Sequence, residues 1–381
     1  MSGQASFGRP MHRPTRIEVD LGAVRHNVAR FGELTGTDVC AVVKGDGYGH
    51  GAVPVARAAL EGGASWIAVA LVEEGLALRE AGIDVPLLVL SEPPVAAIGD
   101  LLEARLTPVV YRAPFLAALD AAARARPEPV GVHLKVDTGM GRVGAVAEDW
   151  DGVMREAAGA AGLRVDGLMT HLARADEPSE STTGEQLVRF AKAGRQAGLL
   201  GIEPRWRHAA NSAGALAHPD ARLDLVRPGI GIYGLSPGMD VDAAEYGLRP
   251  ALELCTEVVF VKHVPGGTPV SYGHRWVAPR DGWVATLPLG YADGVPRALT
   301  NVAEVLIDGR RHPVAGTVCM DLLMVWCDQH RPHVGDRVVL LGAQGEDRVR
   351  VEEWAAIADT ITYEIVTQLT ARLPRGYVDH G

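Results

Sequence analysis

The sequence predicts an α/β protein in which an N-terminal (β/α)8 barrel precedes a C-terminal, mostly-β domain. Between about residues 38 and 235, short apolar runs alternate with amphipathic, alanine-rich segments. There are eight such runs, as a (β/α)8 barrel requires. From Ala251 onward the pattern changes to alternating, strand-like segments with few helix candidates.

The eight apolar runs are the expected barrel strands: VCAVVK (39–44), WIAVAL (66–71), PLLVLS (86–91), LTPVVY (106–111), VGVHLKVD (130–137), VDGLMTHL (165–172), WRHAAN (206–211) and LDLVRPGI (223–230). Helices are expected between them over 53–62, 73–81, 114–125, 150–161 and 183–197. A doubly wound open sheet is the alternative. It requires a Gly-rich dinucleotide turn after an early strand, and no G-x-G-x-x-G occurs there.

The expected domain organisation has three parts. Residues 1–14 form a loose tail, residues 15–245 the barrel, and residues 246–381 the β domain, with helical stretches near 352–359 and 363–372. The segment RIEVD (16–20) also reads as a strand. It is a candidate for pairing with the C-terminal domain rather than with the barrel.

Composition narrows the class of protein. The chain has 381 residues, is 47% hydrophobic and carries a formal net charge of −10, with no long basic run, which argues against nucleic acid and anionic membranes as partners. No apolar run is long enough to span a bilayer, and the N-terminus does not read as a signal peptide. The four cysteines form neither zinc-ligand pairs nor a disulfide framework. We therefore expect a cytoplasmic protein without a metal site.

Lys44 is the most informative residue of the chain. It directly follows the apolar run Ala41 to Val43, and the glycine-rich loop GDGYGHG comes next. A lysine held by apolar walls has a lowered pKa and becomes an amine nucleophile. The plainer alternative is a lysine whose stem packs on the strand while its head reaches water.

Other polar residues follow the later strands, where a barrel enzyme builds its active site. They are Lys135, Asp137 and Arg142 after the fifth strand, His171 at the end of the sixth, Asn211 and Ser212 after the seventh, and Arg227, Gly229 and Ile230 after the eighth. Ser212, Gly229 and Ile230 suit a phosphate cradle. Together with Lys44 they indicate a phosphorylated aldehyde, pyridoxal phosphate.

Arg227 is expected at the ring nitrogen of that cofactor. A guanidinium does not give up its proton, so it can hydrogen-bond the nitrogen without protonating it. A structural ion pair for Arg227 and a satisfied strand-end histidine for His171 are the plainer alternatives.

The motifs taken together resemble bacterial alanine racemase. They occur in the family's order and at similar intervals between about residues 15 and 375: AVVKGDGYGHG, HLKVDTGMGRVG, GLMTHLARADE, HAANSAGAL, LVRPGIGIYG, VSYGHRW, LGYADGVPR and GTVCMD. Two departures stand out. Gly45, Asp46 and Gly47 replace the alanine, asparagine and alanine that members often show, and Trp326 stands where an aspartate is common.

The resemblance implies a role for each matching residue. Lys44 would hold the cofactor covalently and act as the base on the D side, and Tyr272, supplied by the partner subunit of a homodimer, would be the base on the L side. The implied cofactor-binding residues are Lys44, Tyr48, Arg142, His171, Asn211, Ser212, Arg227, Gly229, Ile230 and Tyr363. The implied substrate-binding residues are Arg142, Met320 and Asp321, while Lys135 matches a lysine that can be carbamylated and Tyr291 an entrance residue.

The expected function is therefore interconversion of L-alanine and D-alanine, which supplies D-alanine for peptidoglycan synthesis. Two alternatives remain at this point. One is a broad-specificity amino-acid racemase on the same scaffold, and the other is a non-catalytic protein that binds pyridoxal phosphate or cycloserine. The second domain, with Tyr272, Met320 and Asp321, favours catalysis over a single-domain carrier.

Overall fold

The computed structural model describes residues 12–380, so residues 1–11 of the expected tail lie outside it. The chain forms two compact units, and each is described by itself. The barrel unit comprises Val24–Gly47 and Ala52–Arg249. The β unit comprises the described residues up to Ala23, the short segment Tyr48–Gly51, and the chain from Pro250 onward.

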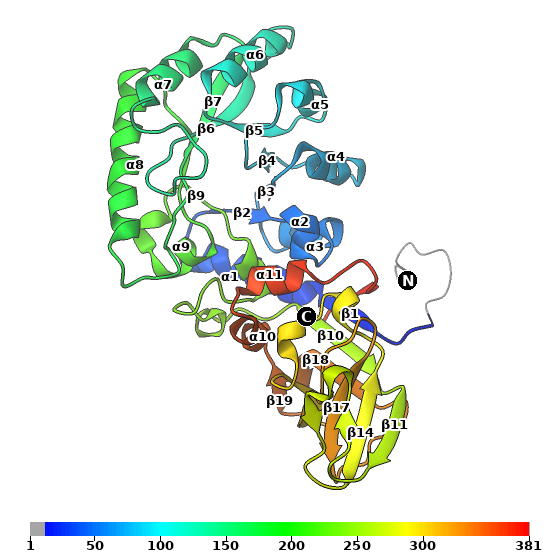
Figure 1. Ribbon diagram of the computed structural model, residues 1–381. Coiled ribbons are helices and arrows are strands. Elements are labelled where there is room, and N and C mark those ends of the chain that lie inside the picture. Colours follow the sequence, from blue (N-terminus) through cyan, green and yellow to red (C-terminus); the bar gives the residue numbers. More distant parts are fainter. Residues whose placement is uncertain (1–11, 381) are drawn as a thin grey trace. The chain divides into compact units, whose positions relative to one another are not determined.

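The barrel unit is built on one parallel sheet in the strand order β8-β7-β6-β5-β4-β3-β2-β9 (Figure 1). Its strands are β2 (Asp38–Val42), β3 (Trp66–Val69), β4 (Leu87–Val89), β5 (Thr107–Val110), β6 (Val130–Lys135), β7 (Leu163–Met169), β8 (Trp206–His208) and β9 (Leu225–Val226). Each neighbouring pair in this order is hydrogen-bonded. Within residues 12–380 no ladder joins the two end strands, β8 and β9, so the barrel is nearly closed. The predicted eight-stranded barrel is confirmed.

Helices alternate with these strands and lie outside the ring (Figure 1). They are α1 (Leu21–Thr35), α3 (Ala52–Glu61), α4 (Val72–Glu80), α5 (Ile98–Glu103), α6 (Ala113–Ala123), α7 (Trp150–Gly159), α8 (Thr182–Leu199) and α9 (Ser212–Ala217), with 3-10 turns η1 (Val95–Ala97), η2 (Pro219–Ala221), η3 (Ile230–Tyr233) and η4 (Ala243–Tyr246). The five helices expected from the sequence are present as α3, α4, α6, α7 and α8, whereas α1, α5 and α9 are additions.

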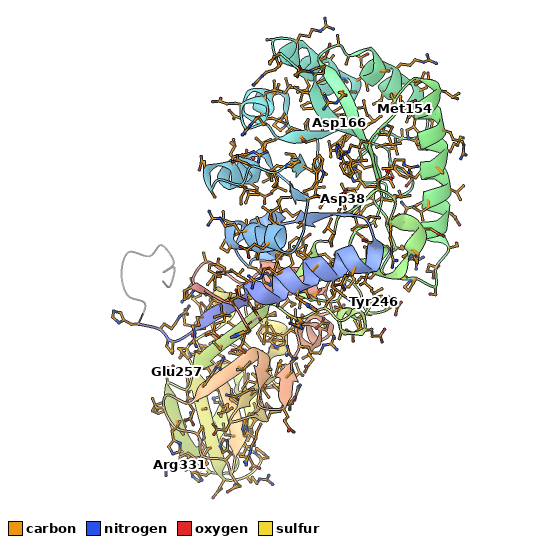
Figure 2. The ribbon with its side chains drawn as sticks, turned by 180° about the vertical axis from the view of Figure 1, so that it is seen from behind. Asp38, Met154, Asp166, Tyr246, Glu257 and Arg331 are labelled. Carbon is orange, nitrogen blue, oxygen red and sulfur yellow. The ribbon has the colours of Figure 1, made fainter. Side chains whose placement is uncertain are left out.

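The barrel strands are apolar on both faces, because one face lines the barrel interior and the other is covered by helices. Ala41, Ile67 and Leu88 on successive strands have no exposed surface. Met154 on α7, labelled in Figure 2, is equally buried on the helical layer. Each fully buried aliphatic side chain of this size contributes roughly 1.5–3 kcal/mol. This layer of apolar contacts fixes the strand ends on which the polar residues stand.

The β unit contains a seven-stranded sheet with the path β16-β15-β18-β10-β1-β20 and β19 beside β18, a three-stranded sheet β11-β14-β17, and the ribbon β12-β13. Its strands are β1 (Arg16–Asp20), β10 (Leu252–Glu257), β11 (Phe260–Val264), β12 (Pro269–Val270), β13 (Trp276–Val277), β14 (Gly282–Leu287), β15 (Glu304–Ile307), β16 (Arg310–Pro313), β17 (Leu323–Asp328), β18 (Arg337–Gln344), β19 (Asp347–Val349) and β20 (Arg375–Val378). Helices α10 (Val351–Ala358) and α11 (Thr362–Thr367) and 3-10 turns η5 (Tyr272–His274), η6 (Tyr291–Asp293) and η7 (Arg297–Leu299) complete it.

Strand β1 lies inside the large sheet of the β unit. It pairs antiparallel with β10, where Ile17 faces Leu254, and parallel with β20, where Ile17 faces Arg375. A central strand has both edges hydrogen-bonded. Arg16–Asp20 is therefore held in the sheet by two strands from the C-terminal part of the sequence. No helix in the described range 12–380 is long and apolar enough to cross a membrane.

Ile17→Ala is expected to lower the free energy of unfolding by about 2–5 kcal/mol, because it opens a cavity at a fully buried position of a central strand. Urea denaturation followed by circular dichroism measures the loss. The matched control is Val188→Ala, since Val188 on α8 is 69% exposed, and it should change stability by less than about 0.5 kcal/mol. Equal losses in the two variants would contradict the central placement of β1.

Candidate active site

Lys44 begins a left-handed turn at the carboxyl end of β2. The strand ends at Val42, two residues earlier than the apolar run indicates, and Gly45, Asp46 and Gly47 follow with φ of 62°, 51° and 62° (α2 in Figure 1, Lys44–Tyr48). Three hydrogen bonds hold this turn: Gly47 N–H to Val43 O at 2.8 Å, Ala52 N–H to Asp46 Oδ1 at 2.8 Å, and Gly45 N–H to Glu74 Oε1 at 2.6 Å. These bonds connect the turn to the residue before it, to the helix after it and to Glu74 on α4.

The Lys44 amine lies in a partly desolvated, positively charged environment. Burial lowers its pKa, the nearby Arg142 guanidinium lowers it further, and Glu74 opposes the shift. A lowered pKa leaves a larger fraction of the amine unprotonated at neutral pH, which is the nucleophilic form.

An anion cradle forms after β8 and β9. The Ser212 Oγ accepts hydrogen bonds from Gly229 N–H at 3.0 Å and Gly231 N–H at 3.1 Å, which leaves its own hydroxyl hydrogen to donate. Among the described residues no acceptor binds the backbone N–H of Ser212 or of Ile230. A Cβ at position 231 would lie 2.6 Å from the Phe31 ring, so only glycine fits there. A hydroxyl hydrogen and loop amides without acceptors suit an anion such as a phosphate group.

Arg227 is almost fully buried and is held by four acceptors. Its Nη1 donates to His208 Nδ1 at 2.8 Å, and its Nη2 donates to Thr170 O at 2.9 Å, Ala209 O at 3.1 Å and His171 Nδ1 at 3.3 Å. Burial lowers its pKa to about 10, which keeps it protonated at neutral pH. Within residues 12–380 its Nε–H has no acceptor, so this donor remains for a ligand.

Behind Arg227 a chain of two buried histidines crosses the barrel interior. A guanidinium only donates, so His208 Nδ1 must accept and its proton resides on Nε2. His208 Nε2 then donates to His133 Nδ1 at 2.9 Å, which places the proton of His133 on its Nε2. Burial holds the pKa of His208 well below its usual value and lowers that of His133 to about 3. Both rings are neutral.

Lys135 at the end of β6 faces the same cationic region. It is buried, and burial followed by the Arg227 and Arg142 charges lowers its pKa to about 8. Asp137 does not complete an ion pair at the site, because its carboxylate accepts the N–H groups of Gly139, Met140 and Gly141 at 2.8–2.9 Å. Asn211 similarly uses its Oδ1 to cap α9 through Gly214 N–H at 2.9 Å.

The remaining predicted site residues lie in the β unit. Tyr48 and Tyr363 lie with ring centroids 6.0 Å apart, and Gly49 is closely packed on α11, because a Cβ there would lie 2.4 Å from Val366 O. Tyr272, Tyr291, Met320 and Asp321 line one cavity of about 620 Å³. Tyr272 is 74% exposed, and Asp321 pairs with Arg372 at 2.7 Å.

Three contributors were missed by the sequence reasoning. His133 and His208 stand in apolar strands and read as ordinary core residues, while Glu74 reads as the N-terminal acid of a helix. One signal that could have found His133 is Gly167 on the neighbouring strand. A Cβ at Gly167 would lie 2.5 Å from the His133 ring, so the glycine leaves the space that the ring occupies.

Fold and site together define a barrel enzyme in which a lysine with a lowered pKa, the loop around Ser212 and a buried arginine stand at the carboxyl ends of the strands. Residues 19–237 match the family model "Alanine racemase, N-terminal domain", and residues 251–377 match "Alanine racemase, C-terminal domain". The chain belongs to the alanine racemase family.

Individual relatives agree over nearly the full length. An alanine racemase of Frankia casuarinae is 45% identical over 94% of this chain and 95% of its own. The structure of alanine racemase from Streptomyces coelicolor A3(2) superposes with a TM-score of 0.92 at 42% identity, covering 96% of this chain and 98% of that one. The enzyme from D-cycloserine-producing Streptomyces lavendulae gives 0.93 at 37% identity, covering 98% and 99%.

Gly167→Ala is expected to cost about 1–3 kcal/mol of stability, because the new methyl group overlaps the His133 ring. Thermal or urea unfolding measures the loss. Gly194→Ala is the control: it lies within α8, where its nearest neighbour would be Leu168 Cδ2 at 3.8 Å, and alanine there should be neutral or stabilising. A neutral Gly167→Ala would show that His133 does not need this space.

The buried histidines predict a loss of stability in acid. His133 takes up a proton near pH 6.5 when unfolded but only near pH 3 when folded, so stability present above pH 6.5 is lost as pH falls toward 3. His133→Gln should therefore reduce the slope of unfolding free energy against pH by about 1.4 kcal/mol per pH unit between pH 6 and 4. Urea denaturation at several pH values measures the slope. An unchanged slope, or an equal change in the exposed control His380→Gln, would contradict it.

Proposed function

We propose that this protein is an alanine racemase that interconverts L-alanine and D-alanine with pyridoxal phosphate and so supplies D-alanine for peptidoglycan synthesis. The observation that carries the proposal is the joint presence, in the barrel unit, of the Lys44 amine, the Ser212 cradle and the free Nε–H of Arg227. An aldehyde, a phosphate and a ring nitrogen are the three groups that these residues would recognise. Pyridoxal phosphate carries all three.

The residues present fit this cofactor. Lys44 would bind it covalently, Ser212, Gly229 and Ile230 would hold its phosphate with Tyr48 and Tyr363, and Asn211, His171, Arg227 and Arg142 would surround its ring. When bound, it supplies the electron sink that makes the α-hydrogen of an amino acid acidic. Arg227 would limit that sink, because it hydrogen-bonds the ring nitrogen without giving it a proton.

Two groups of this chain would move the α-proton. Lys44 Nζ would take or return it on the D side, and Tyr272 Oη on the L side, so neither group has to swing around the substrate. A phenol is a weak base at neutral pH and needs a positive neighbour. The observed contact between His171 and Arg227 supports that pair as its supplier. Arg142, Met320 and Asp321 would bind the substrate.

The active site would be shared between two subunits of a homodimer. Support comes from the surface around Tyr272, where Phe260, Met320 and Leu322 are 56%, 52% and 43% exposed. Exposed apolar side chains that cluster around a cavity mark interaction surfaces. A second copy of the chain would cover this surface and receive Tyr272 beside its own Lys44.

Two further features fit the proposal. The pKa of about 8 for Lys135 keeps part of its amine neutral, and the neutral form is the one that adds CO2 to give a carbamate. The resulting negative charge would stand beside Arg142 and Arg227.

In addition, the cysteines Cys40, Cys255, Cys319 and Cys327 are free thiols, which is consistent with a reducing cytoplasm.

Mixing two inactive variants tests both the bases and the shared site. Lys44→Ala should lose racemisation and the visible absorbance of bound cofactor, whereas Tyr272→Phe should keep the absorbance and lose most turnover. Co-refolded in equal amounts, they should recover about a quarter of wild-type activity, because half of the dimers then carry one complete site of two. The optical rotation of L-alanine over time measures the rate.

The control Tyr246→Phe should be fully active. No recovery on mixing would place Tyr272 in the site of its own subunit, and full activity of Lys44→Ala would remove the assignment altogether. L-serine, L-lysine and L-arginine run in parallel separate the alternatives. Equal rates on all substrates would indicate a broad-specificity racemase, and bound cofactor without any racemisation would indicate a binding protein.

A further inference from the structure

Glu74 joins two parts of the barrel rim. Its Oε2 accepts the N–H groups of Ala70 at 2.8 Å and Leu71 at 3.1 Å, where β3 leads into α4. Its Oε1 accepts the N–H of Gly45 at 2.6 Å. One carboxylate thus ties the end of β3 to the residue that directly follows Lys44.

The turn after Lys44 needs such support, because its left-handed backbone conformation is unfavourable for the residues other than glycine. Left-handed φ/ψ costs roughly 1–2 kcal/mol for each residue other than glycine, and Asp46 and Tyr48 both adopt positive φ. Gly45 and Gly47 accept left-handed and right-handed conformations about equally, so they do not select the observed one. A Cβ at Gly45 would meet nothing within 4 Å, whereas one at Gly47 would lie 3.2 Å from Ala52 N, so packing constrains the later part of the turn but not Gly45.

Hydrogen bonds must therefore specify the conformation at Gly45, the residue that directly follows Lys44. Of the three that hold the turn, one is local to the backbone and one comes from Asp46 within the turn itself. The bond from Glu74 is the one that comes from another strand end, and a charged acceptor makes it stronger than a neutral one.

We propose that Glu74 is a positioning residue that holds the left-handed turn beginning at Lys44, and thereby fixes where the Lys44 amine stands. The consequence for the reaction rests on the proposed role of Lys44. The positioning itself does not, because it is a property of the backbone.

Glu92 offers a matched control. It is a buried carboxylate at a neighbouring strand end, where its Oε2 accepts the N–H groups of Tyr111 at 2.8 Å and Arg112 at 3.0 Å. It also pairs with the Arg112 side chain. In both residues a change to glutamine removes one of two accepting oxygens, but only Glu74 binds the Lys44 turn.

The test is amide hydrogen exchange of the cofactor-loaded protein. In Glu74→Gln the amides of residues 44–48 should exchange about tenfold faster or more, while those of residues 110–113 are unchanged. Glu92→Gln should leave the exchange of residues 44–48 unchanged. The dissociation constant of pyridoxal phosphate should rise by about tenfold in Glu74→Gln and stay constant in Glu92→Gln.

Equal exchange of residues 44–48 in Glu74→Gln and wild type, or an equal increase in Glu92→Gln, would overturn the proposal. If Glu74→Gln does not fold, Glu74→Asp makes the same test, because its shorter side chain cannot reach both segments. If the variants show the expected exchange pattern but the wild-type protein neither binds pyridoxal phosphate nor racemises alanine, the proposed function is wrong while the positioning role stays intact.

Discussion

The concentration of positive charge at one end of the barrel is the constraint on which the site depends. Lys135 and Arg227 are buried, Lys44 is partly desolvated, and Arg142 adds its charge to each of the two lysines. Like charges at close range repel more strongly in the interior than in water. The extensive apolar core offsets the free energy of this repulsion. An anion bound among these groups would reduce the repulsion.

The same charge explains why histidines, not carboxylates, fill the interior behind the site. A carboxylate at His208 would pair with Arg227 and compete with any ligand for its donors. A neutral imidazole accepts one hydrogen bond from the guanidinium and leaves its charge uncompensated. His133 then satisfies the second nitrogen of His208 without adding charge. The histidine chain orients Arg227 and keeps the region positive.

Much of this could be read from the sequence, because eight apolar runs separated by amphipathic segments admit few other folds. The strand ends could not be read as well: the apolar runs continue past Val42 and Val226, where the ladders stop. The segment from Leu252 to Val264 contains no glycine or proline, yet it divides into β10 and β11 of different sheets. Lys44, Ser212 and Arg227 stood out by residue type and position. His133, His208 and Glu74 did not, since their roles arise from partners distant in sequence.

The placement of β1 has a consequence for biosynthesis. The ribosome makes Arg16–Asp20 before the barrel strands, yet both of its neighbours in the sheet, β10 and β20, are made after the whole barrel sequence. At ordinary elongation rates this delay is on the order of tens of seconds. During that time the barrel segments are already available to fold, while the first strand has no sheet to join. Arg16–Asp20 therefore stays unpaired until β10 and β20 have been made.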